Sequence, residues 1–348
     1  MTAGRGNFFE DFRLGQRLAH ATPRTLGEAD AALYAALTGS RFILQSSAPF
    51  ARRLGFRTSP LDDLLVFNTV FGKSVPDISQ NAIANLGYAE GRFPRPLYAG
   101  TTLSAVSQVI GLKENSSGDS GIVTVRTEGL DETGELVLSF ARWVMVRKRD
   151  PKSPAPAAQV PELAAAVDGA SLSAPHRVDF AASFDAAQSG SSLLWDDFEI
   201  GTKIDHVDGV TLEDAEHMMA ARLYQNTARV HFNQQEQAQS RFGRRLVYGG
   251  HVLSLARALS FNGLANAVQI LAINSGRHVA PVFAGDTLYA WSEVLDRHEL
   301  RRDCGALRLR LVATKDLPCS GFPLRDEHGH YLPQVVLDFD LWVLMPRG

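Results

Sequence analysis

The sequence predicts an α+β protein built from two tandem copies of one domain, each an antiparallel sheet wrapped around a long central helix. Three observations lead to this prediction. The chain of 348 residues repeats itself at a nearly constant spacing, each copy has helical patterns early and β-branched runs late, and a Pro-, Ala- and Ser-rich segment separates the copies. This length is enough for two cores, each of roughly 150 residues.

The internal repeat shows which residues of the two copies correspond. Phe12 returns as Phe198, 186 residues later, and Phe56 returns as Phe242 at the same spacing. The final strands correspond at a larger spacing, so the second copy carries an insertion near residues 314–324. We expect one copy at 1–149, a linker at 150–192 that buries little surface, and the second copy at 193–348.

The elements follow from local patterns, taken in chain order. Helices are expected at 25–37 and 211–223, each opened by a Thr with an acidic residue three positions later. Apolar residues at positions i, i+3, i+4 and i+7 predict a helix after Gly250, and residues 64–71 are its counterpart in the first copy. Runs of β-branched and aromatic residues predict strands at 122–127, 137–146, 289–294, 307–314 and 335–344.

Composition excludes several classes of function. The formal net charge of −3, with both signs interspersed, provides no basic field for nucleic acid or an anionic membrane. No apolar run approaches the roughly 18 residues of a membrane span, and the polar start lacks the pattern of a signal peptide. Cys304 and Cys319 have neither the spacing of a zinc site nor that of a disulfide framework. We therefore expect a cytoplasmic protein.

Two segments carry a family resemblance. FGRRLVYGGHVLSLA and RHVAPVFAGDTL resemble the signatures of the MaoC-type hydratases of the hotdog fold, and the repeat then implies a double hotdog. The runs LDDLLVFNTVFGKSVPDIS, NLGYAEGR and YGGHVLSLARALSFNGLANA more narrowly resemble the mesaconyl-CoA hydratase family. This resemblance implies reversible hydration of a dicarboxylic enoyl-CoA in glyoxylate assimilation through the ethylmalonyl-CoA route. It implies no metal or redox cofactor, because coenzyme A belongs to the substrate.

The family's hydration motif resembles T-G-D-x-N-P-x-H, with a Phe eleven residues after the His. In the second copy His231 lies eleven residues before Phe242 and matches the motif histidine, but Asn226 stands where the motif has Asp. In the first copy Ser40 and Gln45 stand at the two positions. The resemblance therefore implies that only the second copy is catalytic.

The chemistry explains why these residue types matter. Adding water to an α,β-unsaturated thioester needs a base for the water, an acid at the α-carbon and stabilisation of an enolate. A histidine such as His231 ordinarily titrates near neutrality and can exchange protons in both directions. Gly249 matches the family's oxyanion glycine and presents its N–H at a helix start, with Tyr248 and Gly250 beside it in the predicted substrate site.

Further candidates address the missing carboxylate and the charges of the substrate. Asp62 and Asp63 align near Tyr248 and Gly249, and we consider them first as carboxylate partners of His231. Arg229 occurs only in the second copy and is a candidate for the free carboxylate of the acyl group. Arg244 and Arg245 belong to a basic cluster that suits the phosphates of coenzyme A, although such clusters are usually solvated surface.

Three other functions remain open on this sequence. One is hydration of a neutral enoyl-CoA, the second is binding of acyl-CoA without catalysis, and the third is a thioesterase, which the hotdog scaffold also hosts. A double hotdog pairs its own two halves, so both a monomeric pseudo-dimer and a homodimer are compatible with it.

Overall fold

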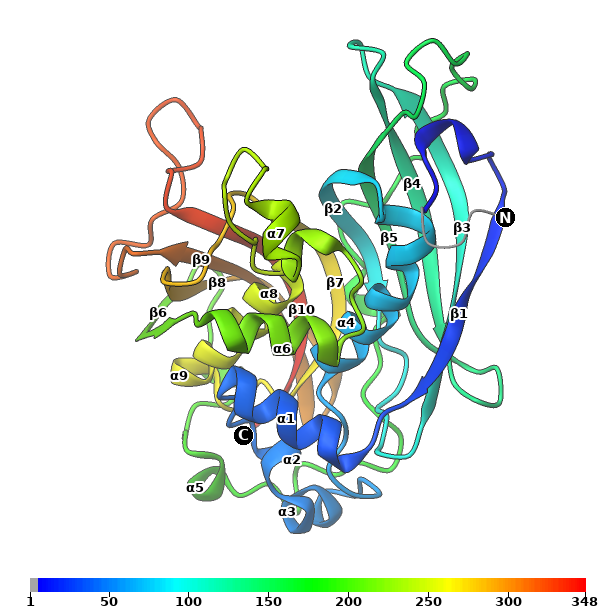
Figure 1. Ribbon diagram of the computed structural model, residues 1–348. Helices are drawn as coiled ribbons and strands as arrows, with labels where there is room; N and C mark the ends of the chain where they lie inside the picture. The colour runs from blue at the N-terminus through cyan, green and yellow to red at the C-terminus, as the bar shows by residue number, and fades with distance from the viewer. Residues whose placement is uncertain (1–5) are drawn as a thin grey trace.

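The two repeats form one continuous sheet. The computed structural model describes residues 6–348, so the first five residues of the predicted first copy lie outside the description. Ten antiparallel strands follow the order β1-β3-β4-β5-β2-β7-β10-β9-β8-β6 (Figure 1), and β2 pairs with β7 where the repeats meet. The strands are β1 (Arg17–Thr25), β2 (Ala82–Arg92), β3 (Thr102–Glu114), β4 (Ser120–Leu130), β5 (Leu136–Arg147), β6 (Lys203–Thr211), β7 (Gln269–His278), β8 (Thr287–Arg301), β9 (Cys304–Lys315) and β10 (Val335–Pro346).

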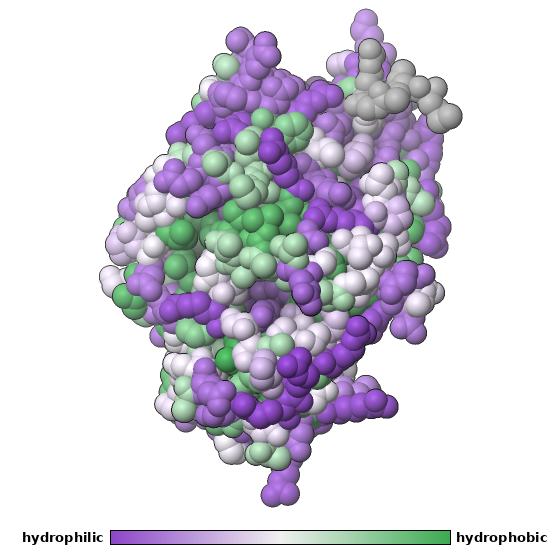
Figure 2. Space-filling view, turned by 60° about the horizontal axis from the view of Figure 1, so that its bottom comes forward, coloured by the Kyte–Doolittle hydropathy of each residue, from purple (hydrophilic) through white to green (hydrophobic). Residues whose placement is uncertain are grey.

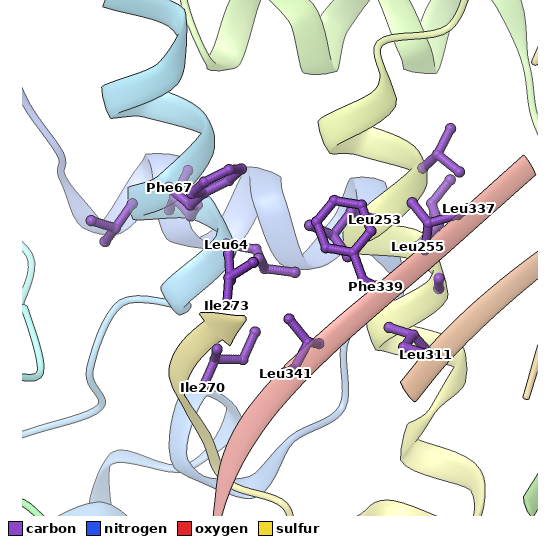
Figure 3. Close-up of a cluster of buried hydrophobic side chains, with 14 of the residues drawn as sticks. Leu64, Phe67, Leu253, Leu255, Ile270, Ile273, Leu311, Leu337, Phe339 and Leu341 are labelled. Carbon is purple, nitrogen blue, oxygen red and sulfur yellow. The ribbon is translucent and has the colours of Figure 1, made fainter. Parts of the chain in front are cut away.

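Two central helices, α4 (Asp63–Ser74) and α8 (Gly249–Leu259), pack against this sheet and against each other. The α+β double-hotdog prediction is confirmed. The expectation of two separate cores is wrong, because one large cluster of buried side chains draws on both helices and both halves of the sheet. Figure 3 shows this cluster, with Leu64 and Phe67 of α4, Leu253 and Leu255 of α8, and Ile273 and Phe339 from β7 and β10.

The two early helices, α1 (Glu28–Thr38) and α6 (Asp214–Leu223), begin three residues later than predicted. Thr25 and Thr211 are instead the last residues of β1 and β6. Each threonine lies opposite a threonine of the neighbouring strand, and the Oγ1 atoms of Thr25 and Thr102 are 2.7 Å apart. Strand pairing therefore overrides the local capping pattern. The shorter helices are α2 (Ile43–Ser46), α3 (Ala48–Arg53), α5 (Ala186–Ser189), α7 (Gln234–Gln237) and α9 (Phe261–Leu264).

The segment at 150–192 is a linker, but the expectation that it buries little is wrong in part. Val167, Val178 and Phe180 are buried in a second cluster together with Trp342 of β10. The indole Nε1 of Trp342 donates a hydrogen bond of 2.9 Å to the carbonyl oxygen of Val167. The linker is therefore fixed along the sheet by a few apolar side chains, although most of its residues are exposed.

The insertion in the second repeat also packs against the sheet. Cys319 is buried beside Trp291, whose Nε1 donates to the carbonyl oxygen of Pro323 at 3.0 Å. The face seen in Figure 2 has mixed hydropathy, with a hydrophobic area near its centre. Within residues 6–348 no helix is long and apolar enough to cross a membrane.

Candidate active site

His231 ends a short 3-10 turn (Arg229–His231), where a backbone contact fixes its tautomer. Its Nδ1 lies 3.0 Å from the carbonyl oxygen of Leu246. Because a carbonyl only accepts, Nδ1 carries the hydrogen and Nε2 keeps its lone pair. Loss of solvation lowers the pKa of His231 to about 4. At neutral pH the imidazole is therefore an uncharged base with one free nitrogen.

Asn226 shapes the loop that leads to His231. Its side-chain Oδ1 accepts the N–H of Ala228 at 3.0 Å, so the amide oxygen is used in a local turn. This loop runs directly over α4. A Cβ at Gly72 would lie 2.0 Å from the carbonyl oxygen of Tyr224, so only glycine allows this close approach. The loop of the second repeat is thus held against the central helix of the first.

The start of α8 presents free backbone donors next to His231. Tyr248 precedes the helix, and the N–H groups of Gly249 and Gly250 have no backbone partner among the described residues. These N–H groups lie at the positive end of the helix dipole. A Cβ on Gly250 would lie 2.0 Å from the side-chain Oδ1 of Asn68, so α4 closes in on this end of α8. The arrangement suits an oxygen atom that gains negative charge.

His278 is a functional candidate that the sequence reasoning missed. It ends β7, and its ring covers Gly249, because a Cβ there would lie 2.5 Å from His278 Nδ1. Its Nε2 is 3.2 Å from the hydroxyl of Tyr88, which comes from the first repeat. Loss of solvation lowers the pKa of His278 to about 4. The sequence does contain a signal for this candidate, because His278 aligns with Phe93 and a histidine at this position is therefore specific to the second copy.

Tyr248 joins these groups into one cluster. Its ring centroid lies 5.4 Å from that of His231, 5.5 Å from that of Phe71 and 5.8 Å from that of Tyr224. Its buried hydroxyl has no hydrogen-bond partner in the described part of the chain, and burial raises its pKa. A buried hydroxyl without a partner is costly, so this hydroxyl is a candidate donor for a bound group.

Asp62 and Asp63 do not meet His231. They begin α4, the first-repeat counterpart of α8, and so belong to the opposite end of the helix pair. Asp62 Oδ1 accepts the N–H of Leu64 at 2.9 Å, and Asp63 Oδ2 accepts the N–H of Ile270 at 2.7 Å. Burial, with the charge of Asp62, raises the pKa of Asp63 to about 8. Both carboxyl groups therefore have structural partners of their own.

The three predicted arginines lie at the surface side of the site. Arg229 is half-exposed, with its Nε 4.0 Å from Glu236 Oε2, and so turns away from His231. Arg245 Nη2 lies 2.6 Å from Asp214 Oδ1. The guanidinium of Arg244 stacks 3.9 Å from the ring centroid of Phe283. A role for Arg244 and Arg245 in binding coenzyme A phosphates stays a prediction.

The chain is similar to known proteins over nearly its whole length. The mesaconyl-CoA hydratase family model matches residues 1–318. A β-methylmalyl-CoA dehydratase of Chloroflexus aurantiacus is 62% identical over 98% of this chain and 97% of its own. A mesaconyl-CoA hydratase of Cereibacter sphaeroides is 56% identical over the full length of both chains.

Solved structures give the same fold. A MaoC domain protein dehydratase of Chloroflexus aurantiacus has a TM-score of 0.98 and 61% identity, and the match covers 100% of this chain and 99% of that one. A Mycobacterium tuberculosis protein with a double hotdog fold has a TM-score of 0.76 at 28% identity, over 98% of this chain and 99% of its own. The fold and the resemblance drawn from the sequence are thereby confirmed.

Proposed function

The chain belongs to the mesaconyl-CoA hydratase family, and we propose that it reversibly adds water to mesaconyl-CoA to form β-methylmalyl-CoA. The observation that carries this proposal is the uncharged His231, whose Nε2 is left free and whose ring packs against Tyr248 at the start of α8. The two relatives named above support the substrate, because one is named for the hydration and the other for the dehydration of the same pair of compounds.

The proposed reaction begins at His231. Its Nε2 takes a proton from water, and the resulting hydroxide adds to the β-carbon of the enoyl group. The electron pair of the double bond moves to the thioester oxygen, where the N–H groups of Gly249 and Gly250 stabilise the enolate. The α-carbon then takes up the proton that His231 removed from water, directly or through His278, so that the thioester is restored and both imidazoles return to their neutral forms. No cofactor enters this scheme, since coenzyme A arrives with the substrate.

The aspartate of the family motif is absent, and His278 is placed to provide part of the proton transfer or charge stabilisation that the aspartate would provide. Asn226 cannot accept a proton from water at neutral pH, and Asp62 and Asp63 lie elsewhere. His278 packs against Gly249, where the thioester oxygen would bind, and Tyr88 orients it. We assign His278 to hold the enolate oxygen or return a proton to the α-carbon.

The test is an assay of the purified protein with mesaconyl-CoA, followed by the absorbance of the enoyl thioester. His231→Ala should lower turnover by about 10²–10⁴-fold, as expected for loss of a general acid–base group. His328→Ala, at an exposed histidine that follows the insertion, is the matched control and should leave turnover unchanged. Near-normal activity of His231→Ala would refute the assignment.

The same assay separates the rival functions. Equal rates with crotonyl-CoA would favour a hydratase of neutral enoyl-CoA esters. Tight binding of a CoA ester with no absorbance change would favour a protein that binds without catalysis. Release of free thiol would identify a thioesterase, which is a different reaction on the same scaffold.

A further inference from the structure

Arg142 is a buried cation for which the protein supplies no anion. It lies on β5 and is 0% exposed. Its Nη2 donates to Ser74 Oγ at 2.8 Å, and its Cζ lies 4.2 Å from the ring centroid of Phe71. Its Nη1 has only long contacts, at 3.5 Å, to Ser79 Oγ and Asn85 Oδ1, and its Nε has no hydrogen-bond partner, so no carboxylate of residues 6–348 pairs with this guanidinium. Burial lowers the pKa of Arg142 only to about 10, so the group is charged at neutral pH.

A second buried arginine shows how this chain compensates such a charge elsewhere. Arg257 of α8 is 6% exposed and, like Arg142, forms no ion pair within 4.0 Å among the described residues, but the nearby carboxyl group of Asp62 raises its pKa against the effect of burial. An unpaired buried charge costs several kcal/mol, and a counter-charge removes much of that cost. Arg142 lacks this compensation within the protein. The missing anion is therefore expected to come with a ligand.

The surroundings of Arg142 border the proposed active site. Tyr88 pairs with Arg142 across β2 and β5, and its hydroxyl reaches His278 Nε2. Tyr248 packs against Phe71 on one side and His231 on the other. The positive charge of Arg142 opposes the rise in pKa that burial causes at both tyrosine hydroxyls. Each tyrosine thus contacts a histidine of the site and lies within electrostatic reach of Arg142.

We propose that Arg142, with the hydroxyls of Tyr88 and Tyr248, binds the free carboxylate of the acyl group, an inference that rests on the proposed function. In mesaconyl-CoA this carboxylate is bonded to the β-carbon that receives water, so its binding site must lie close to His231. A guanidinium matches a carboxylate with two parallel hydrogen bonds. The partnerless Nε of Arg142 and the partnerless hydroxyl of Tyr248 are the donors left free for it.

This assignment replaces the one made for Arg229. Arg229 faces solvent and Glu236, where a carboxylate would gain little from one more exposed ion pair. Arg142 lies in the water-poor interior, where recognition of a charge discriminates strongly against a neutral analogue. The site would therefore select dicarboxylic acyl groups over neutral ones of the same length.

The test compares kcat/KM for mesaconyl-CoA and crotonyl-CoA in the wild type and in Arg142→Met. Loss of one partner of a buried charge pair should lower kcat/KM for mesaconyl-CoA by about 10²–10³-fold. The value for crotonyl-CoA should change by less than about threefold, since no carboxylate is involved. Arg126→Met is the matched control: it lies on the neighbouring strand β4, pairs with Glu90 at the surface, and should affect neither substrate.

Each outcome decides one claim. A similar loss with both substrates, or no loss with either, would overturn the carboxylate site while leaving the proposed function standing. A wild type inactive on mesaconyl-CoA would refute the proposed function itself. If Arg142→Met does not fold, the inhibition constants of succinyl-CoA and butyryl-CoA, measured with the wild type, test the carboxylate site instead. Succinyl-CoA should bind at least about tenfold more tightly, and equal inhibition would overturn the site.

Discussion

At the scale of single residues, the site depends on side chains whose partners lie far away in the sequence. His231 is fixed by the carbonyl of Leu246, and His278 by the hydroxyl of Tyr88 from the other repeat. Each histidine is uncharged at neutral pH because the surrounding protein lowers its pKa. Two neutral imidazoles beside a helix start can exchange protons with substrate without adding charge to the site.

His278→Phe tests whether the second histidine acts in the reaction. The change copies Phe93 of the first repeat, so the volume at this position suits the fold. We expect kcat to fall by about 10²-fold, since one proton-transfer or oxyanion group is lost. Steady-state kinetics with the enoyl thioester measure it.

Tyr88→Phe is the companion variant, because it keeps His278 but removes the hydroxyl that orients it. Its loss of kcat with crotonyl-CoA, which carries no carboxylate, should be smaller, about tenfold. A His278→Phe enzyme that retains full turnover and a wild-type circular dichroism spectrum would show that His278 only fills space.

At the scale of elements, the start of α8 is where the two repeats and the chemistry meet. Gly249→Ala should lower kcat by about 10²–10³-fold, because the new Cβ would displace His278 and shift an oxyanion donor. Gly321→Ala in the insertion is the matched control, since a Cβ there meets nothing within 4 Å. Kinetics of both variants under one set of conditions would measure the difference. Equal activity of the two would argue against a donor at Gly249.

The linker gives an element-scale prediction for stability. Phe180→Ala removes a ring that is 2% exposed and should lower the free energy of unfolding by about 3–5 kcal/mol. Val160→Ala changes a linker residue that is 69% exposed and should alter it by less than about 0.5 kcal/mol. Urea unfolding curves measure both. A Phe180→Ala effect as small as that of Val160→Ala would mean that the linker contributes little to stability.

Elements also show what the sequence could and could not predict. The central helices and the late strands followed from apolar spacing and β-branched runs, which are local signals. Strand β2 was not predicted, because Gly87 and Gly91 interrupt it and because its partner β7 lies in the other repeat. Arg142 was not predicted as a site residue, although its strand was, because a lone arginine in a strand usually faces solvent. His231 was found because the repeat and the family motif fixed its position.

At the scale of the whole molecule, the repeats are not independent domains. β2 and β7 pair, the main core spans both repeats, and the proposed site takes Tyr88 and Arg142 from the first repeat and both histidines from the second. On the proposed assignment, the first repeat therefore contributes to the site without supplying the base.

The histidines whose pKa is lowered also predict how global stability depends on pH. The pKa values of His206, His231 and His278 are lowered to about 4, and that of His251 to about 3, from an ordinary value of 6.5. Between pH 6.5 and 4 the unfolded chain therefore binds more protons than the folded one at these four positions, and stability falls as the pH falls. Asp63, with a pKa raised to about 8, acts in the opposite direction over the same range.

As the pH falls, the four histidines lower the free energy of unfolding, whereas Asp63 and its neighbour Asp62 raise it. Because the histidines are more numerous, we expect the free energy of unfolding to decrease steadily from pH 6.5 to pH 4. Urea titrations at half-unit intervals of pH would measure the slope. His206→Asn removes one of these titrations at the structural contact to Ser292, far from the reacting groups, and should make the slope shallower. A slope of opposite sign would mean that the two carboxyl groups dominate, and hence that the histidines are more solvated than their burial indicates.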